Sequence, residues 1–310
     1  MRLKTALARG LTAIALTATL GLVAQARAAA AIQAVGVENE YADVIGQIGG
    51  TYVHVTTIMS DPNTDPHSFE VSPRIAASIA GADLIVENGI GYDSWADKMI
   101  AAAPKVGRQV INVQHLRALP DDTANPHLWY DPATMPLVAQ AIAAKLSALD
   151  PAHAAYFASQ EAAFAASLKP WFAALATFKV TYPNTAVAVT EPVGDYMLHA
   201  AGATIETPWA LEAAIMNDTD PAPQDVTKQN ALLKNGAVKV FLYNQQVTDP
   251  LTQSFLELAH KAGIPVVGVY ETMPTPGYSY QSWMLAEVKA LTKALADKTS
   301  TESLLSASSK

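Results

Sequence analysis

Short apolar runs rich in valine and isoleucine alternate along the chain with longer amphipathic stretches rich in alanine. The apolar runs span residues 31–37, 53–58, 84–86, 110–113, 186–189, 238–242 and 266–269, and candidate helices span 40–48, 73–80, 94–102, 135–149, 196–201, 223–234, 250–262 and 280–296. Strands that alternate with helices favour parallel sheets with helices on both faces. The pattern therefore predicts an α/β fold.

The alternation is interrupted once, between residues 151 and 182. Bulky apolar residues recur there at roughly helical spacing, and no strand-like run separates them. A helix of that length would span roughly 45 Å, enough to cross a whole domain, although Pro170 should kink or interrupt it. We predict two doubly wound parallel-sheet lobes, 29–150 and 183–297, joined by a long linker helix, 151–182, and followed by a flexible tail, 298–310.

The first 28 residues have the features of a secretory signal peptide. Basic residues open the segment, an apolar stretch runs from residue 11 to 24, and Ala26-Arg27-Ala28 forms a cleavage site of small residues. The chain contains no cysteine, which excludes disulfides, thiolate metal sites and a lipid-anchored cysteine. We therefore expect a periplasmic protein that is freely soluble and does not insert into the membrane.

The chain is acidic, with 28 Asp and Glu against 20 Lys and Arg, and four of the basic residues lie in the leader. Such a protein has no electrostatic reason to bind nucleic acid or an anionic membrane surface. We expect no nucleic-acid partner. A negative body does favour cations, although acidity more often serves solubility.

One short pattern occurs twice, sixty positions apart: Asp65-Pro66-His67-Ser68-Phe69 and Asn125-Pro126-His127-Leu128-Trp129. Proline restricts its own backbone and that of the residue before it, and the aromatic side chain can be buried while the imidazole points away. Both histidines follow strand-like runs of the first lobe, and ligands of open α/β sheets bind at the carboxyl ends of strands. His67 and His127 are therefore candidate metal ligands or proton carriers.

In the second lobe the corresponding strand ends carry acids, Glu191 before Pro192 and Glu271 after Tyr270. Proline suits the first turn of a helix, which places Glu191 at the mouth of the sheet. Glu38 and Glu87 occupy comparable positions in the first lobe and compete for the same role. A histidine pair that faces a carboxylate pair across a cleft would form a coherent N2O2 metal site.

Imidazole ligands suit Zn, Cu, Fe and Ni, whereas carboxylates and water favour Mn and Mg. Acids near ligating histidines normally orient them, and Glu70 and Asp131 are available for that role or for capping and turn formation. The chain has no G-x-S-x-G elbow, no Walker A sequence and no H-E-x-x-H motif. Common hydrolase and nucleotide-binding signatures are thus missing.

The combination of these motifs resembles the substrate-binding proteins of metal-importing ABC transporters, specifically the cluster that binds zinc and manganese. The likeness covers nearly the whole mature chain. It is carried by the segments Asp65-Pro66-His67-Ser68-Phe69-Glu70, Ser72-Pro73, Ala82-Asp83-Leu84-Ile85-Val86-Glu87-Asn88-Gly89, Asn125-Pro126-His127-Leu128-Trp129-Tyr130-Asp131-Pro132, Thr190-Glu191-Pro192 and Tyr270-Glu271-Thr272.

The resemblance implies two α/β lobes bridged by a rigid helix, with one metal between them held by His67, His127, Glu191 and Glu271. Zinc-binding members usually have a third histidine where this chain has Glu191, and often a histidine-rich loop that is missing here. Manganese-binding members have glutamate at that position. The last ligand is usually aspartate, whereas Glu271 is one methylene longer. The resemblance therefore favours Mn(II) somewhat over Zn(II).

We expect a monomeric periplasmic receptor that captures Mn(II) or Zn(II) and delivers it to the membrane permease of an ABC importer, without catalysing a reaction. Two alternatives stay open on the sequence. One is a metal-dependent hydrolase in which Glu271 serves as the base, because catalytic sites need an open position and a nearby base. The other is an adhesion or chaperone module with an incidental metal.

Overall fold

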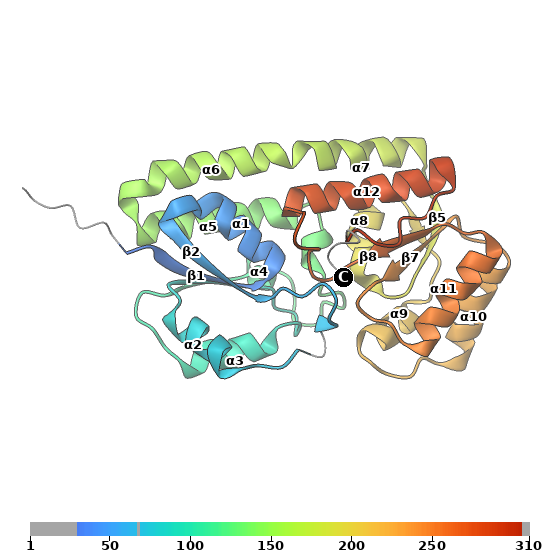
Figure 1. Cartoon of the computed structure of the whole chain (residues 1–310), viewed down its shortest axis with the longest axis horizontal. Coiled ribbons are helices and arrows are strands. Elements are labelled where there is room, and N and C mark those ends of the chain that lie inside the picture. The colour runs from blue at the N-terminus through green and yellow to red at the C-terminus, as the bar shows by residue number, and fades with distance from the viewer. Residues whose placement is uncertain (1–29, 67–68, 306–310) are drawn as a thin grey trace, which may run out of the picture. The chain divides into compact units, whose positions relative to one another are not determined.

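Two four-stranded parallel sheets form the framework of the protein, one in each lobe (Figure 1). The computed structural model describes residues 30–66 and 69–305. The first sheet has the order β2-β1-β3-β4 and the second β6-β5-β7-β8; the strands are β1 Ile32–Glu38, β2 Val53–Met59, β3 Leu84–Glu87, β4 Gln109–Asn112, β5 Ala186–Val189, β6 Thr204–Ile205, β7 Val240–Asn244 and β8 Val266–Val269. The predicted α/β fold with two parallel-sheet lobes is confirmed.

Helices connect successive strands, and several begin where the sequence provides a cap. Ser72 accepts from the backbone N–H of Ile75 to cap α2, and Asp249 forms a capping box with Thr252 at the start of α11. The α-helices are α1 Asn39–Gly49, α2 Pro73–Gly81, α3 Ser94–Ala102, α4 Val113–Leu116, α5 Thr134–Leu149, α6 Ala154–Ser167, α7 Lys169–Thr181, α8 Asp195–Ala200, α9 Trp209–Met216, α10 Pro223–Lys234, α11 Pro250–Ala262 and α12 Tyr280–Asp297; the short 3-10 helices are η1 Gly50–Tyr52, η3 Leu128–Tyr130, η4 Pro151–His153 and η5 Pro192–Gly194.

The segment between the lobes is divided in two, as Pro170 predicts. Helix α6 ends at Ser167, α7 begins at Lys169, and Pro170 lies in the first turn of α7. Proline cannot donate the helical hydrogen bond but fits the first turn of a new helix. Leu168 keeps a right-handed helical conformation (φ −77°), so α6 and α7 run end to end (Figure 1). The two helices of the linker therefore continue in one direction across the interruption at Leu168.

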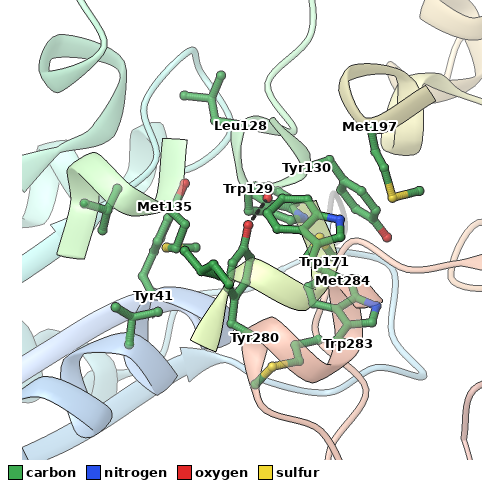
Figure 2. Packing of buried hydrophobic residues seen from close by; sticks show 14 of the residues in the cluster. Tyr41, Leu128, Trp129, Tyr130, Met135, Trp171, Met197, Tyr280, Trp283 and Met284 are labelled. Atoms are coloured by element: carbon green, nitrogen blue, oxygen red, sulfur yellow. Dashed lines mark hydrogen bonds between the residues drawn. The ribbon is translucent and has the colours of Figure 1, made fainter. Parts of the chain in front are cut away.

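One buried aromatic group joins the linker to both lobes (Figure 2). Tyr280 at the start of α12 donates to the backbone oxygen of Trp129 at 2.6 Å, and its ring meets Trp171 of α7 edge to face at 6.0 Å. Tyr130 meets Trp283 in the same way at 5.4 Å. Such aromatic pairs each contribute about 0.5–1.5 kcal/mol beyond the area they bury. The core is therefore continuous across the lobes, and residues Ala31–Lys310 form one compact unit by their contacts.

The segment after α12 lies along the second sheet as far as it is described. Thr301 forms a parallel bridge with Val267 of β8, donates to Val266 O at 2.8 Å and accepts from Gly268 N at 2.9 Å. These backbone bonds satisfy one edge of β8, which would otherwise present unpaired groups. This part of the tail is therefore paired, whereas its serine- and lysine-rich sequence predicts a flexible tail.

The proposed signal peptide, residues 1–28, lies outside the described residues. Within the part of the chain that is described, no helix is long and apolar enough to cross a bilayer.

Candidate metal centre

His127 is fully buried and its ring is held in one orientation. Its backbone N–H donates to Asn125 Oδ1 at 3.0 Å, and its ring Nδ1 lies 2.8 Å from the same oxygen. The amide nitrogen of Asn125 donates to Pro192 O at 2.8 Å, which fixes the other end of the amide as the oxygen. The ring Nδ1 must therefore carry the proton, and neutral His127 presents a lone pair at Nε2.

Trp129 supports this orientation from behind. It is completely buried, and its ring meets the His127 imidazole edge to face at 5.5 Å. The aromatic residue two positions after the histidine is thus part of the core. In the other copy of the Pro-His pattern, Phe69 is half-buried, with its ring centroid 5.0 Å from that of Trp95. His67 of that copy lies outside the described residues.

Glu271 approaches His127 from the second lobe. Its Oε2 lies 3.2 Å from His127 Nε2 and accepts a hydrogen bond from the Tyr92 hydroxyl at 3.1 Å. Both Nε2 and a carboxylate oxygen present lone pairs, so a cation, either a proton or a metal ion, is needed to bring them together favourably. Glu271 is 1% exposed, so bulk solvent does not reach this contact.

Glu191 lies at the end of the second sheet and reaches the same group through an amide. Asn244 Nδ2 donates to Glu191 Oε1 and to Glu271 Oε1, both at 2.8 Å. Glu191 and Glu271 each follow their strand by two residues, and Asn244 ends β7 between them. These positions are at the carboxyl ends of strands, where open α/β sheets bind ligands.

Three of the four proposed ligands thus belong to one hydrogen-bonded group, His127 and Glu271 directly and Glu191 through Asn244. His67 lies outside the described residues. Across residues 30–66 and 69–305, no group of three or more histidine, aspartate and glutamate side chains is arranged so that it could hold a metal ion. The ligand role of these residues therefore stays a prediction that the described geometry supports but does not complete.

The competing acids of the first lobe have other neighbours. Burial raises the pKa of Glu38, and the nearby charges of Asp93 and Glu40 raise it further. Burial likewise raises the pKa of Glu87 to about 8, with added effects from Asp93 and Asp97. Glu87 accepts from Asn112 at 3.2 Å. These acids favour their neutral forms and suit structural roles.

Glu40 is a further buried acid close to Glu271. It is fully buried; burial raises its pKa, and the charge of Glu271 raises it as well. The pKa of Tyr92 is also raised, first by burial and then by Glu271 and Glu40. Carboxyl groups buried this close to one another disfavour ionising together, and a divalent cation would stabilise their charged forms. The surroundings of the site are therefore suited to a cation.

The expected orienting acids do not orient the described histidine. Asp131 pairs with Arg117 at 2.9 Å and accepts from Ala133 N at 2.9 Å, so it serves turn formation. Glu70 is exposed to solvent. Asn125 performs the orienting function instead, two residues before His127. A neutral amide carries no charge pattern in the sequence that would mark it for this role.

Comparison with known proteins identifies the same class of protein. Residues 38–294 match the family described as ZnuA, the periplasmic component A of the zinc-uptake complex. The iron-binding protein YfeA of Yersinia pestis is 28% identical over 133 residues, 41% of this chain and 42% of that protein. The manganese-binding lipoprotein MntA of Bacillus subtilis is 27% identical over 135 residues, 41% of this chain and 43% of that protein. The chain thus spans less than half the length of these curated relatives.

Solved structures show the same fold. The periplasmic zinc-binding protein TroA of Treponema pallidum has a TM-score of 0.71 at 16% identity, covering 87% of this chain and 99% of that one. The binding protein FpvC of Pseudomonas aeruginosa, solved with Mn2+, has a TM-score of 0.70 at 21% identity, covering 86% and 99%. At these identities the likeness concerns the fold alone.

Proposed function

Because the chain belongs to the ZnuA family of periplasmic zinc-uptake components, we propose that it captures Mn(II) or Zn(II) between its two lobes and passes the ion to the permease of an ABC importer. It does so as a monomer and catalyses no reaction. The proposed ligands are His67 and His127 from the first lobe and Glu191 and Glu271 from the second. Two carboxylates would balance the charge of a divalent ion, and neutral imidazoles would add none.

The observation that supports this most is the 3.2 Å approach of His127 Nε2 to Glu271 Oε2. The two atoms come from opposite lobes, both offer lone pairs, and both are shielded from water. A proton could bridge them, but imidazole with carboxylate oxygen is also a normal donor pair for first-row divalent ions. A metal in this position would join the lobes directly.

The proposal is tested by metal analysis of the mature protein after its metal is removed and replaced. We expect one Zn2+ or Mn2+ per chain after dialysis, lost in His127→Ala and in Glu191→Ala. His199→Ala is the matched control, because His199 is an exposed histidine on α8. Stoichiometric binding that persists in both ligand variants would refute the proposed site.

A further inference from the structure

Gln246 is a buried glutamine, 5% exposed, that follows β7 by two residues. Its Oε1 accepts from two consecutive backbone N–H groups of the second lobe, that of Glu271 at 2.7 Å and that of Thr272 at 2.8 Å. Its Nε2 donates to the Thr272 hydroxyl at 3.2 Å and to Thr64 O of the first lobe at 2.8 Å. These partners settle which end of the amide is the oxygen, because backbone N–H groups only donate and a carbonyl only accepts.

The Gln246 side chain takes over where the backbone pairing of the second sheet stops. The pairing of β7 with β8 reaches Gln245, whose N–H donates to Val269 O at 3.0 Å. Further along, the N–H groups of Glu271 and Thr272 bind the Gln246 oxygen instead of a neighbouring strand. Leaving a buried N–H without a partner is costly. The amide therefore stabilises the particular conformation of this turn.

This contact involves the proposed ligand itself. Gln246 binds the backbone N–H of Glu271, and Oε2 of the same glutamate faces His127 Nε2 at 3.2 Å. A glutamate side chain has several rotatable bonds, and a fixed backbone removes part of the freedom that ion binding would otherwise have to restrict. The amide thus pre-organises Glu271 to face His127.

The other end of the amide extends to the first lobe. Thr64 lies in a turn after β2 that is closed by Asp61, which accepts from Asn63 N at 2.9 Å and from the Thr64 hydroxyl at 2.8 Å. Gln246 Nε2 therefore donates to a carbonyl whose own position is specified. One side chain thus joins the backbone of Glu271 to a turn of the opposite lobe.

We propose that Gln246 is a positioning residue of the metal centre, which fixes the backbone of Glu271 from both lobes and thereby sets how long a captured ion is retained. The inference rests on the proposed function, because it takes Glu271 as a ligand. A ligand that is already held in place loses little conformational freedom when the ion binds. Removing the restraint should therefore raise the rate of release more than it lowers the rate of binding.

The test compares the wild type with Gln246→Met, which nearly keeps the side-chain volume and removes its hydrogen bonds. Substituting the partners of metal ligands typically changes affinity by about 10–100-fold. For whichever ion the wild type binds, Zn2+ or Mn2+, we expect the dissociation constant to rise by about that factor in competition with a chromophoric chelator. Most of the change should lie in the rate of release. Hydrogen exchange of the metal-free variant should be faster at the N–H groups of Glu271 and Thr272.

Gln246→Glu is the conservative variant, because a carboxylate oxygen still accepts from both N–H groups. It should keep most of the hydrogen-exchange protection of Glu271 and release the ion more slowly than Gln246→Met. If Gln246→Met does not fold, Gln246→Asn takes its place, since its shorter side chain withdraws the amide from both lobes.

Gln114→Met is the matched control. Gln114 is 6% exposed, accepts from Ile90 N at 2.8 Å and donates to Asp121 at 2.9 Å. Neither partner is a proposed ligand or adjacent to one. The variant should therefore lower stability and leave metal release unchanged.

The outcomes separate the inference from the proposed function. A wild type that binds neither ion contradicts the proposed function, and the inference with it. If the wild type binds an ion, wild-type release from folded Gln246→Met overturns the inference alone, because the contact is then only structural. Unchanged hydrogen exchange at Glu271 in that variant does the same, and so does equally fast release from Gln114→Met.

Discussion

The side chain of Asn39 pairs with the backbone of Met273 across the two lobes: Nδ2 donates to Met273 O at 2.8 Å, and Oδ1 accepts from Met273 N at 2.9 Å. Asn39 is the first residue of α1, directly after β1, and Met273 lies two residues beyond Glu271. Both residues are buried. The turn that carries Glu271 is thus fastened to the first lobe through the backbone N–H and C=O of Met273.

Asn39→Ala should therefore loosen this turn. The buried N–H and C=O of Met273 lose their partner, which costs about 1–3 kcal/mol for each group. We expect lower stability in urea unfolding and faster release of bound metal, measured by chelator chase. Asn217→Ala is the control, since Asn217 is exposed and its side chain donates to Ala213 O, one turn earlier, at 2.6 Å. Unchanged metal release in Asn39→Ala would show that the pair does not restrain Glu271.

Asn125 should matter more for metal binding than Asp131. Asn125→Ala removes the acceptor of the His127 ring proton and also the bond to Pro192 O. We expect metal affinity to fall by about 10–100-fold. Asn125→Asp keeps the acceptor at Nδ1 but not the donor to Pro192, so it should recover part of the affinity.

Asp131→Ala provides the comparison for this prediction, because Asp131 pairs with Arg117 rather than His127. It should change the metal affinity by no more than about twofold, since substitutions away from such features usually change free energies by less than about 0.5 kcal/mol. Equal losses in the Asn125 and Asp131 variants, measured by chelator competition, would contradict the assignment of Asn125 as the orienting residue.

Sequence patterning predicted most of the framework because buried parallel strands and amphipathic helices have distinct periodicities. Residues 186–189 and 266–269 coincide with β5 and β8, and 223–234 and 250–262 coincide with α10 and α11. Helix α9 was missed because Trp-Ala-Leu-Glu-Ala-Ala-Ile-Met has almost no polar face to reveal a helical period. The two-residue strand β6 is too short for any period.

The same reasoning identifies the ionisable residues of the proposed site but not the amides beside them. Histidines and acids at strand ends attract attention because they ionise, so His127, Glu191 and Glu271 were predicted as ligands. Asn244 ends β7 at an equivalent position, but a neutral amide carries no such signal. The pairing of Asn39 with Met273 joins residues 234 positions apart, and no local pattern specifies it. These amides orient the ionisable groups, and only the folded chain reveals them.

A buried pair of acids in the second lobe should make stability depend on pH. Burial raises the pKa of Glu212 to about 10, with a further contribution from the charge of Asp195, and burial raises the pKa of Asp195 to about 7. The folded protein keeps protons that the unfolded chain releases near about pH 4. The contribution of this pair to the stability of the protein should therefore be complete below about pH 4. It should decline as the pH rises through 7 toward 10.

Glu212→Gln tests that relationship, because an amide donates to Asp195 without a proton to lose. Each proton held only by the folded state contributes a slope of about 1.4 kcal/mol per pH unit. Urea unfolding between pH 5 and pH 9 should therefore show a shallower decline in the variant. Glu257→Gln, at an exposed position of α11, should keep the wild-type slope. Identical slopes in wild type and Glu212→Gln would rule out a proton shared by this pair.

Gly268→Ala should detach the tail from β8. A Cβ at Gly268 would lie 2.0 Å from the backbone oxygen of Glu302, closer than any real contact, so one of the two segments must move. The bonds of Thr301 to Val266 and Gly268 would then be lost. We expect a loss of about 1–3 kcal/mol in stability and earlier cleavage near the C-terminus in limited proteolysis.

Gly46→Ala is the matched substitution for the tail experiment. Gly46 lies within α1, and the nearest atom to an added Cβ is Val55 Cγ2 at 4.0 Å. Alanine stabilises a helix interior relative to glycine by about 0.5–1 kcal/mol, so this variant should unfold at higher urea with an unchanged proteolysis pattern. If the tail of Gly268→Ala stays protected from the protease, then β8 moves and the tail does not. The pairing of Thr301 with β8 would then be more stable than the position of β8 in the sheet.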